Sequence, residues 1–353
     1  MKEPEIAATK PILVNVKAGR PISWCSCGRS QNQPFCDGSH KGSDFRPIKY
    51  VPEEDGELLL CACKRTSSQP ICDGSHNNLG GDYAVSAQEA EPQVAMSPWV
   101  EKFPGFSAAA LDGGCYVARV GQEAYEQYGQ LGLAPAIIKA TGARHLSYYS
   151  GTLSPGASSI LRFNGSDLAL FAVDGALAIS IGGRSFKASP ESGIAVKGDE
   201  AFQLINESNT PVRVEFAVCP EAQGIDVLDE MPAQFDENAP DRVVSVDPAK
   251  REAMADRFYQ VLVDKNCAGS AVTQFIGEIP KSRAKHHRHL YEEAILVLRG
   301  EGFMWTDASK APVKAGDVIF LPKKQAHSLE CTSDGGMRLM GVFFPSGSPA
   351  INY

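Results

Sequence analysis

Short apolar runs separated by turn residues recur along the whole chain, and this pattern predicts a mainly β protein. Near the N-terminus, the apolar runs at residues 12–16 and 57–60 each precede a loop that contains cysteines. Later runs fall into two blocks, at 168–173 and 212–218 in the first and at 294–298, 318–321 and 339–344 in the second. Apolar runs bounded by glycine and polar residues are typical of strands, and many short strands of this kind predict sandwiches or barrels.

Helical signals are few. Asp is a favoured N-cap and Pro a favoured first helical residue, so Asp247-Pro248 predicts a helix that extends to about Tyr259. Residues 122–130 are the other candidate for a short helix, and Pro135 is expected to interrupt the segment that follows.

Composition narrows the class of protein. The 353 residues are too many for one ordinary core and indicate two or three domains. A net charge of −8 argues against a nucleic-acid binder. No run approaches the roughly 18 apolar residues of a membrane helix, and the first residues lack the apolar core of a secretory signal. We therefore expect a cytoplasmic protein without membrane or nucleic-acid partners.

A pattern of cysteine and histidine occurs twice in the first 85 residues, and the ligand candidates repeat at a constant offset (61 − 25 and 76 − 40 both give 36). Each copy offers three thiolates and one imidazole, a set that suits an iron–sulfur cluster better than a disulfide framework. A neutral histidine ligand raises the reduction potential relative to four cysteines. A structural zinc site is the alternative interpretation of the same donor set.

Both copies resemble the CDGSH, or NEET, iron–sulfur family, whose signature is Cys-x-Cys-x2-Ser/Thr-x3-Pro-x-Cys-Asp-Gly-Ser-His. The resemblance covers about the first quarter of the chain and implies two [2Fe–2S] clusters, with both halves of a pseudo-dimer in one chain. The ligands it implies are Cys25, Cys27, Cys36 and His40 for one cluster and Cys61, Cys63, Cys72 and His76 for the other.

A second group of metal ligands lies in the last block. On a strand, residues two apart face the same side, so His287 and His289 should project together, with Glu293 at the same parity and Glu292 at the opposite one. His327 follows later in the chain. Three histidines and one carboxylate suit iron(II), manganese, nickel or zinc.

These residues resemble the two motifs of the cupin superfamily, which the ligands match together with Gly300, Gly316 and Pro322. Lys324 stands where the family usually has glycine, which affects a turn more than the ligand. The block at 145–219 resembles a second cupin without the metal, because Arg162, Asn164 and Leu168 stand at the first three ligand positions and Phe202 lies near the last. The resemblance implies a bicupin with one degenerate barrel.

The predicted domains are a twin CDGSH domain (1–85), a linker (86–98), a degenerate cupin barrel with an N-terminal extension (99–225) and a metal-binding cupin barrel (226–353). The fold expected is thus a small β-rich CDGSH iron–sulfur domain followed by two cupin β-barrels with few helices.

Electron carriers and a metal centre in one chain predict a redox enzyme. The leading hypothesis is an iron(II)-dependent cupin oxygenase that acts on a small organic substrate with dioxygen, while the clusters carry electrons from a reductase or another donor. One alternative is a redox sensor, or an electron- or cluster-transfer protein, whose bicupin does no chemistry. The other is a cupin dioxygenase, decarboxylase or isomerase with regulatory clusters. The residues indicate no catalytic general base, and a homodimer through the cupin barrels is expected.

Overall fold

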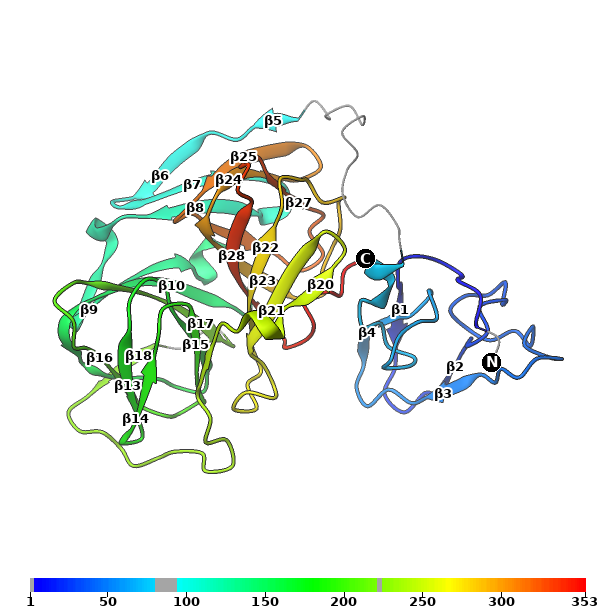
Figure 1. The fold of residues 1–353 in the computed structure, drawn as a ribbon, viewed down its shortest axis with the longest axis horizontal. Helices are drawn as coiled ribbons and strands as arrows, with labels where there is room; N and C mark the ends of the chain where they lie inside the picture. Colours follow the sequence, from blue (N-terminus) through cyan, green and yellow to red (C-terminus); the bar gives the residue numbers. More distant parts are fainter. Residues whose placement is uncertain (1–2, 80–93, 221–223) are drawn as a thin grey trace. The chain divides into compact units, whose positions relative to one another are not determined.

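The computed structural model describes residues 3–79, 94–220 and 224–353, and it confirms a mainly β protein (Figure 1). The chain divides into two compact units, of which one comprises residues 1–83 together with 348–353 and the other residues 84–347. Helical structure within the described ranges is limited to short 3-10 turns: η1 (Ser75–Asn78), η2 (Asp112–Gly114), η3 (Gln122–Ala124), η4 (Lys139–Thr141) and η5 (Pro248–Lys250). None of the helices found there is long and apolar enough to cross a membrane.

The N-terminal unit consists of two small antiparallel ribbons, in which β1 (Ile12–Val16) pairs with β4 (Gly56–Leu60), and β2 (Ile22–Trp24) pairs with β3 (Ile48–Tyr50). The apolar runs at 12–16 and 57–60 thus form strands as predicted. The core is small and includes the ligand candidates themselves, because Cys61 and Cys63 pack with Trp24 and Leu60.

The larger unit contains two barrel-like systems. Strands of the first follow the order β14-β13-β16-β10-β17-β12-β15-β19, with β9, β11 and β18 paired at its sides. Their bounds are β9 (Glu126–Ile137), β10 (Ser147–Ser158), β11 (Ile160–Phe163), β12 (Asp167–Ala172), β13 (Leu177–Ile181), β14 (Arg184–Ala188), β15 (Ser192–Val196), β16 (Phe202–Asn206), β17 (Val212–Cys219), β18 (Ile225–Leu228) and β19 (Val243–Ser245).

The second system has a large sheet of order β20-β21-β22-β28-β23-β26-β8-β7-β6 and a smaller one of order β27-β24-β25-β5. The large sheet comprises β6 (Trp99–Phe103), β7 (Phe106–Ala110), β8 (Tyr116–Val120), β20 (Glu252–Met254), β21 (Arg257–Val263), β22 (Thr273–Ile279), β23 (Glu292–Arg299), β26 (Val318–Leu321) and β28 (Met337–Phe344). The smaller sheet comprises β5 (Ala95–Met96), β24 (Glu301–Trp305), β25 (Ser309–Lys314) and β27 (Ser328–Cys331).

Strand pairing divides the chain differently from the predicted boundaries. β8 pairs with β26 and β5 with β25, so residues 95–120 complete the second barrel and not the first. β19 lies beyond residue 226 but pairs with β15 of the first barrel. Residues 348–353 group with the N-terminal unit. Part of the predicted linker, residues 86–93, lies outside the described residues.

Both helix predictions were wrong. The Asp247 carboxylate does cap the backbone N–H of Ala249 at 3.0 Å, but the turn ends at Lys250 and the chain continues as the hairpin β20–β21. The β-branched and aromatic residues of β21 pair with β22 in the sheet, and this pairing outweighs the helix start signal. Residues 126–137 form β9, which runs through Pro135 and pairs with β10; a proline is tolerated there because β9 lies off the main path of the sheet.

The first barrel is filled by apolar side chains. Leu168 and Phe202, which stand at or near ligand positions in the cupin alignment, are buried in its core, and Phe202 stacks on Phe163 with ring centroids 6.3 Å apart. The guanidinium of Arg162 forms an ion pair with Asp226 at 3.0 Å, and the Asn164 amide donates to the same carboxylate. These four positions therefore have structural partners in place of a metal.

Candidate metal and cluster sites

The two cysteine–histidine motifs adopt the same local geometry. The thiols of Cys25 and Cys27 lie 3.6 Å apart, and the Cys36 thiol lies 3.2 Å from Nδ1 of His40. In the second copy the corresponding distances are 3.5 Å and 3.4 Å. A tetrahedral metal with bonds of about 2.0–2.3 Å has ligand–ligand edges of about 3.3–3.8 Å. The donor pairs are therefore spaced for one metal each, with Nδ1 as the ligating nitrogen, and none of the ten cysteines forms a disulfide.

Fixed polar residues of the motif hold this geometry. The Ser30 hydroxyl donates to the Phe35 carbonyl at 2.6 Å, and the Thr66 hydroxyl does the same to Ile71 at 2.7 Å. In the first copy, Asp37 accepts hydrogen bonds from the hydroxyl and backbone N–H of Ser39 and from the backbone N–H of Gln31. These bonds keep the pKa of Asp37 far below its usual range. The aspartate of the motif is thus a turn-forming residue.

A single lysine connects the two copies. Lys64 is 2 % exposed, and its ammonium donates to the side chain of Gln33 at 2.9 Å and to the carbonyl of Cys61 at 3.1 Å. It also lies 4.6 Å above the ring of Trp24. Burial lowers the pKa of Lys64, whereas the thiolates of Cys25 and Cys61 act in the opposite direction. The ammonium is thus placed to offset negative charge on both sets of ligands.

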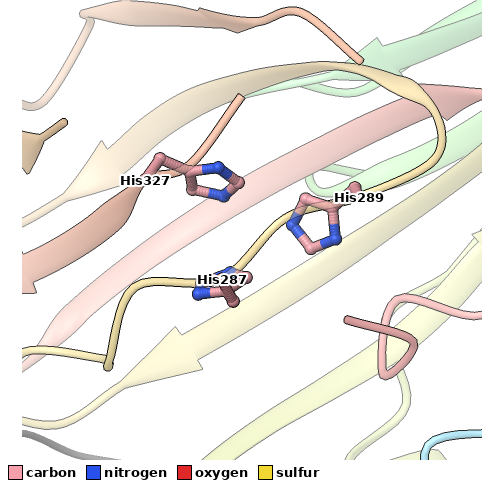
Figure 2. A group of neighbouring side chains, drawn as sticks. All are labelled: His287, His289 and His327. Carbon is pink, nitrogen blue, oxygen red and sulfur yellow. The ribbon is translucent and has the colours of Figure 1, made fainter. Parts of the chain in front are cut away.

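In the C-terminal barrel the structure brings together His287, His289 and His327, whose ligand atoms all lie within 4.8 Å of one another (Figure 2). His287 and His327 exchange backbone hydrogen bonds of 3.1 Å, which join the segment before β23 to the start of β27. His287 and His289 lie together as predicted, although His287 lies in an isolated bridge and His289 precedes β23, so they are not on the continuous strand that the parity argument assumed.

Two of these imidazoles are oriented by the backbone. Nδ1 of His287 lies 2.9 Å from the carbonyl of Lys285, and Nδ1 of His327 lies 2.9 Å from the carbonyl of Gln325. Each Nδ1 therefore donates a proton, which makes Nε2 the nitrogen whose lone pair can bind a metal. Burial lowers the pKa of His287 well below its ordinary value and that of His327 to about 4. Both rings are thus neutral at pH 7, as metal ligation requires.

Glu293 lies beside this triad. Its carboxylate is 3.6 Å from Nε2 of His289, and burial raises its pKa to about 8. The neighbouring Glu292 points away from the triad, as its parity predicts. Its carboxylate accepts the backbone N–H groups of Arg144, His145 and Leu146 at 2.8–3.2 Å.

Lys324 adopts the left-handed backbone conformation, with φ of 68°, that glycine usually provides at this cupin position. Its N–H donates to the carbonyl of His289 at 2.8 Å. The departure from the family pattern therefore leaves the turn, and the position of His327, intact.

Two further side chains lie near the triad. Tyr291 stacks on His289 with ring centroids 4.6 Å apart and on Phe343 at 3.9 Å. Arg257 is 6 % exposed and donates to the carbonyl of Leu329 at 3.4 Å. The sequence gives a weak indication that Tyr291 lies near the triad, since it comes two positions after a candidate ligand. The sequence gives no such indication for Arg257, because it is an arginine at the start of an apolar strand.

Family models match two parts of the chain. The model described as "Iron-binding zinc finger CDGSH type" matches residues 4–41, and that described as "Cupin domain" matches residues 277–343. The chain thus carries an N-terminal CDGSH domain and a C-terminal cupin domain, as the motifs predicted. The CDGSH domain implies iron–sulfur cluster binding, and the cupin implies a divalent metal.

Individual relatives match over short regions. The chain is 44% identical over 54 residues to the mouse "CDGSH iron-sulfur domain-containing protein 3, mitochondrial", which is 15% of this chain and 39% of that protein. It is 34% identical over 64 residues to an "Oxalate-binding protein" of Thermotoga maritima, which is 18% of this chain and 53% of that protein. The chain thus spans about two fifths and about half, respectively, of these relatives.

Among solved structures, a mutant of Bacillus subtilis oxalate decarboxylase aligns with a TM-score of 0.50 at 12% identity, over 63% of this chain and 74% of that one. At this identity the likeness shows the fold alone. Together, the CDGSH domain and the cupin fold support a metal-binding cupin enzyme or a redox protein.

Proposed function

We propose that this protein is a redox metalloenzyme in which the cupin binds one iron(II) ion and the CDGSH domain binds two [2Fe–2S] clusters that carry electrons. The ligands are His287, His289, His327 and Glu293 for the iron and the two Cys3His sets for the clusters. The substrate class is a small organic molecule, and dioxygen is the oxidant.

The observation that carries this proposal is the grouping and orientation of the three cupin histidines, which suit a metal ligand set. The backbone carbonyls of Lys285 and Gln325 set the tautomers of His287 and His327. Three imidazoles whose ligand atoms lie within 4.8 Å of one another form a good ligand set for a divalent ion.

The side chains around the triad have defined tasks in this proposal. Bound iron would supply Lewis acidity and open coordination positions for substrate and dioxygen. Tyr291 fixes the plane of His289 by stacking. Glu293 serves as a further oxygen ligand or holds a proton, because its pKa of about 8 lies near neutrality. Buried Val297 and Leu329, close to the ligands in sequence, help to exclude water.

The first test is metal and sulfide analysis combined with EPR of the reduced protein. We expect two [2Fe–2S] clusters and one mononuclear iron per chain. His287→Ala and His327→Ala should lose the mononuclear iron and retain both clusters, while the exposed Arg288→Ala serves as the control. A wild-type protein without a mononuclear metal, or with zinc in the Cys3His sets, contradicts the proposal.

The second test concerns the coupling of the two kinds of site. The clusters are reduced anaerobically, and the protein is then mixed with oxygen and candidate substrates in single-turnover experiments. Faster turnover with reduced clusters than with oxidised ones supports electron delivery. Equal rates show that the clusters do not feed the cupin iron.

A second candidate function is favoured by Arg257. This buried arginine lies close enough to lower the pKa of His287 slightly by charge repulsion. A buried guanidinium beside a metal suits a small carboxylate substrate, and one relative is named for binding oxalate. In this case the cupin would act on a small dicarboxylate without electrons from the clusters.

Oxalate binding to the metal-loaded protein, measured by calorimetry, tests this second function. Arg257→Met should weaken oxalate binding about tenfold or more, and no binding by the wild type contradicts it.

A further inference from the structure

The two cluster sites differ in exposure although their motifs are alike. In the first copy, Cys36 and His40 are partly exposed. In the second copy, the equivalent residues Cys72 and His76 are only 2 % and 6 % exposed. Since the local geometry of the motifs is the same, the difference must come from chain outside them.

Residues 348–353, which we call the C-terminal cap, lie on the second motif and provide this cover. The side-chain amide of Asn77 donates to the carbonyl of Ala350 at 2.7 Å. The cap approaches so closely that a Cβ atom on Gly74 would lie 2.6 Å from the same carbonyl oxygen. At the equivalent glycine of the first copy, Gly38, the nearest atom to such a Cβ would be the end of the Lys41 side chain, at 3.8 Å.

The cap covers the outer side of the histidine ligand. Nδ1 of His76 faces the Cys72 thiol, so Nε2 points away from the cluster position. This Nε2 atom is buried, and Asn352, itself 6 % exposed, lies against the imidazole. A hydrogen bond within the cap, from the N–H of Ile351 to the carbonyl of Ser348 at 3.2 Å, helps to hold its turn.

The two copies differ at one position that contacts the cap in the second copy. With the offset of 36, Asn77 of the second copy corresponds to Lys41 of the first (77 − 36 = 41). Asn77 is buried and bonded to the cap, whereas Lys41 is exposed. A lysine at position 77 would replace a buried amide donor by a charge that must be desolvated, and it would disfavour docking of the cap.

We propose that the C-terminal cap protects the second cluster, so that the two clusters are released at different rates and the first is the one that an external chelator or acceptor reaches. The proposal rests on the presence of two clusters in the proposed function. The two clusters would then differ in function, with an accessible first cluster and a retained second cluster.

The test follows cluster release from the full-length protein, reconstituted with both clusters, into excess of a ferrous-iron chelator and reductant at constant pH. Visible absorbance and EPR record the loss. His40→Cys marks the first cluster by changing its EPR signal, so that each phase can be assigned. For the wild type we expect a fast phase from the first cluster and a slow phase from the second, of equal amplitude.

Asn77→Lys and Asn352→Ala should accelerate the slow phase about tenfold and leave the fast phase unchanged, because each removes a contact of the cap. The matched control is the reverse exchange, Lys41→Asn, which should change neither phase. A chain that binds fewer than two clusters by iron and sulfide analysis overturns the proposed function. A chain that binds two clusters but releases them at one rate, or whose slow phase is unaffected by both variants, overturns the cap alone.

Discussion

At the scale of single residues, a buried lysine contacts both copies of the CDGSH motif. Lys64 contacts Gln33 of the first copy and the backbone of Cys61 in the second, so its charge would act on both of the proposed clusters. Reduction adds a negative charge, which a nearby ammonium stabilises. We predict that Lys64→Met lowers the reduction potentials by roughly 50–100 mV, the interaction of unit charges about 8–14 Å apart at an effective dielectric constant of about 20.

Redox titration followed by EPR measures this shift. Lys49→Met, an exposed lysine in β3, is the control and should change the potentials little. Unchanged potentials in Lys64→Met would show that the charge is neutralised or displaced when the clusters are bound.

Glu215 carries a second prediction at this scale. Burial raises the pKa of its carboxyl group, an effect that Arg213 at 3.5 Å and the Ser150 hydroxyl at 2.8 Å oppose. The folded state therefore favours the protonated form, and its contribution to stability falls as pH rises above the unfolded value near 4.3. Glu215→Gln should remove this fall, so the variant should gain stability relative to wild type as the pH rises above that unfolded value. Chemical denaturation at several pH values measures it; a constant difference argues against a raised pKa.

At the scale of elements, Glu292 joins β23 to the segment before β10 through three backbone N–H groups. These are hydrogen bonds to a buried acceptor, 4 % exposed, and their loss leaves the donors without partners. We predict that Glu292→Ala lowers the free energy of unfolding by about 2–4 kcal/mol, measured by urea denaturation. The exposed Glu301→Ala is the control. Metal content should persist in Glu292→Ala, since this side chain points away from the triad; its loss would mean that the strand end has moved.

The same scale shows what sequence can predict. The strands, and the grouping of the candidate ligands, follow from local patterns: alternation, apolar runs and fixed motif spacing around His287 and Cys25. The helix predicted after Asp247 does not form, because the hairpin β20–β21 pairs with β22. This pairing is not visible in the local sequence pattern. The assignment of β8 to the second barrel, and the contact of Asn77 with Ala350 over 273 positions, are equally non-local. Such contacts depend on the packed fold and leave no periodicity in the chain.

At the scale of the molecule, two compact units should respond separately to their metals. A ligand that binds the folded state only stabilises it by about 2.7 kcal/mol at a concentration 100 times its Kd. Adding iron(II) or manganese(II) to metal-depleted protein should therefore raise the unfolding temperature of the cupin unit and leave that of the CDGSH unit unchanged. Calorimetry, with cluster absorbance to identify the CDGSH transition, measures both. A single transition that shifts as a whole would show that the units unfold together.

The position of the cap at residues 348–353 also fixes an order of events during synthesis. The last ligand of the second cluster, His76, leaves the ribosome 272 residues before Ser348 (348 − 76 = 272). At about 5–20 residues per second, the site is complete but uncovered for roughly 14–54 s. A cluster can be inserted within this interval, before the cap is made. The cap is translated only after both barrels, so a cluster inserted during synthesis would enter an uncovered site.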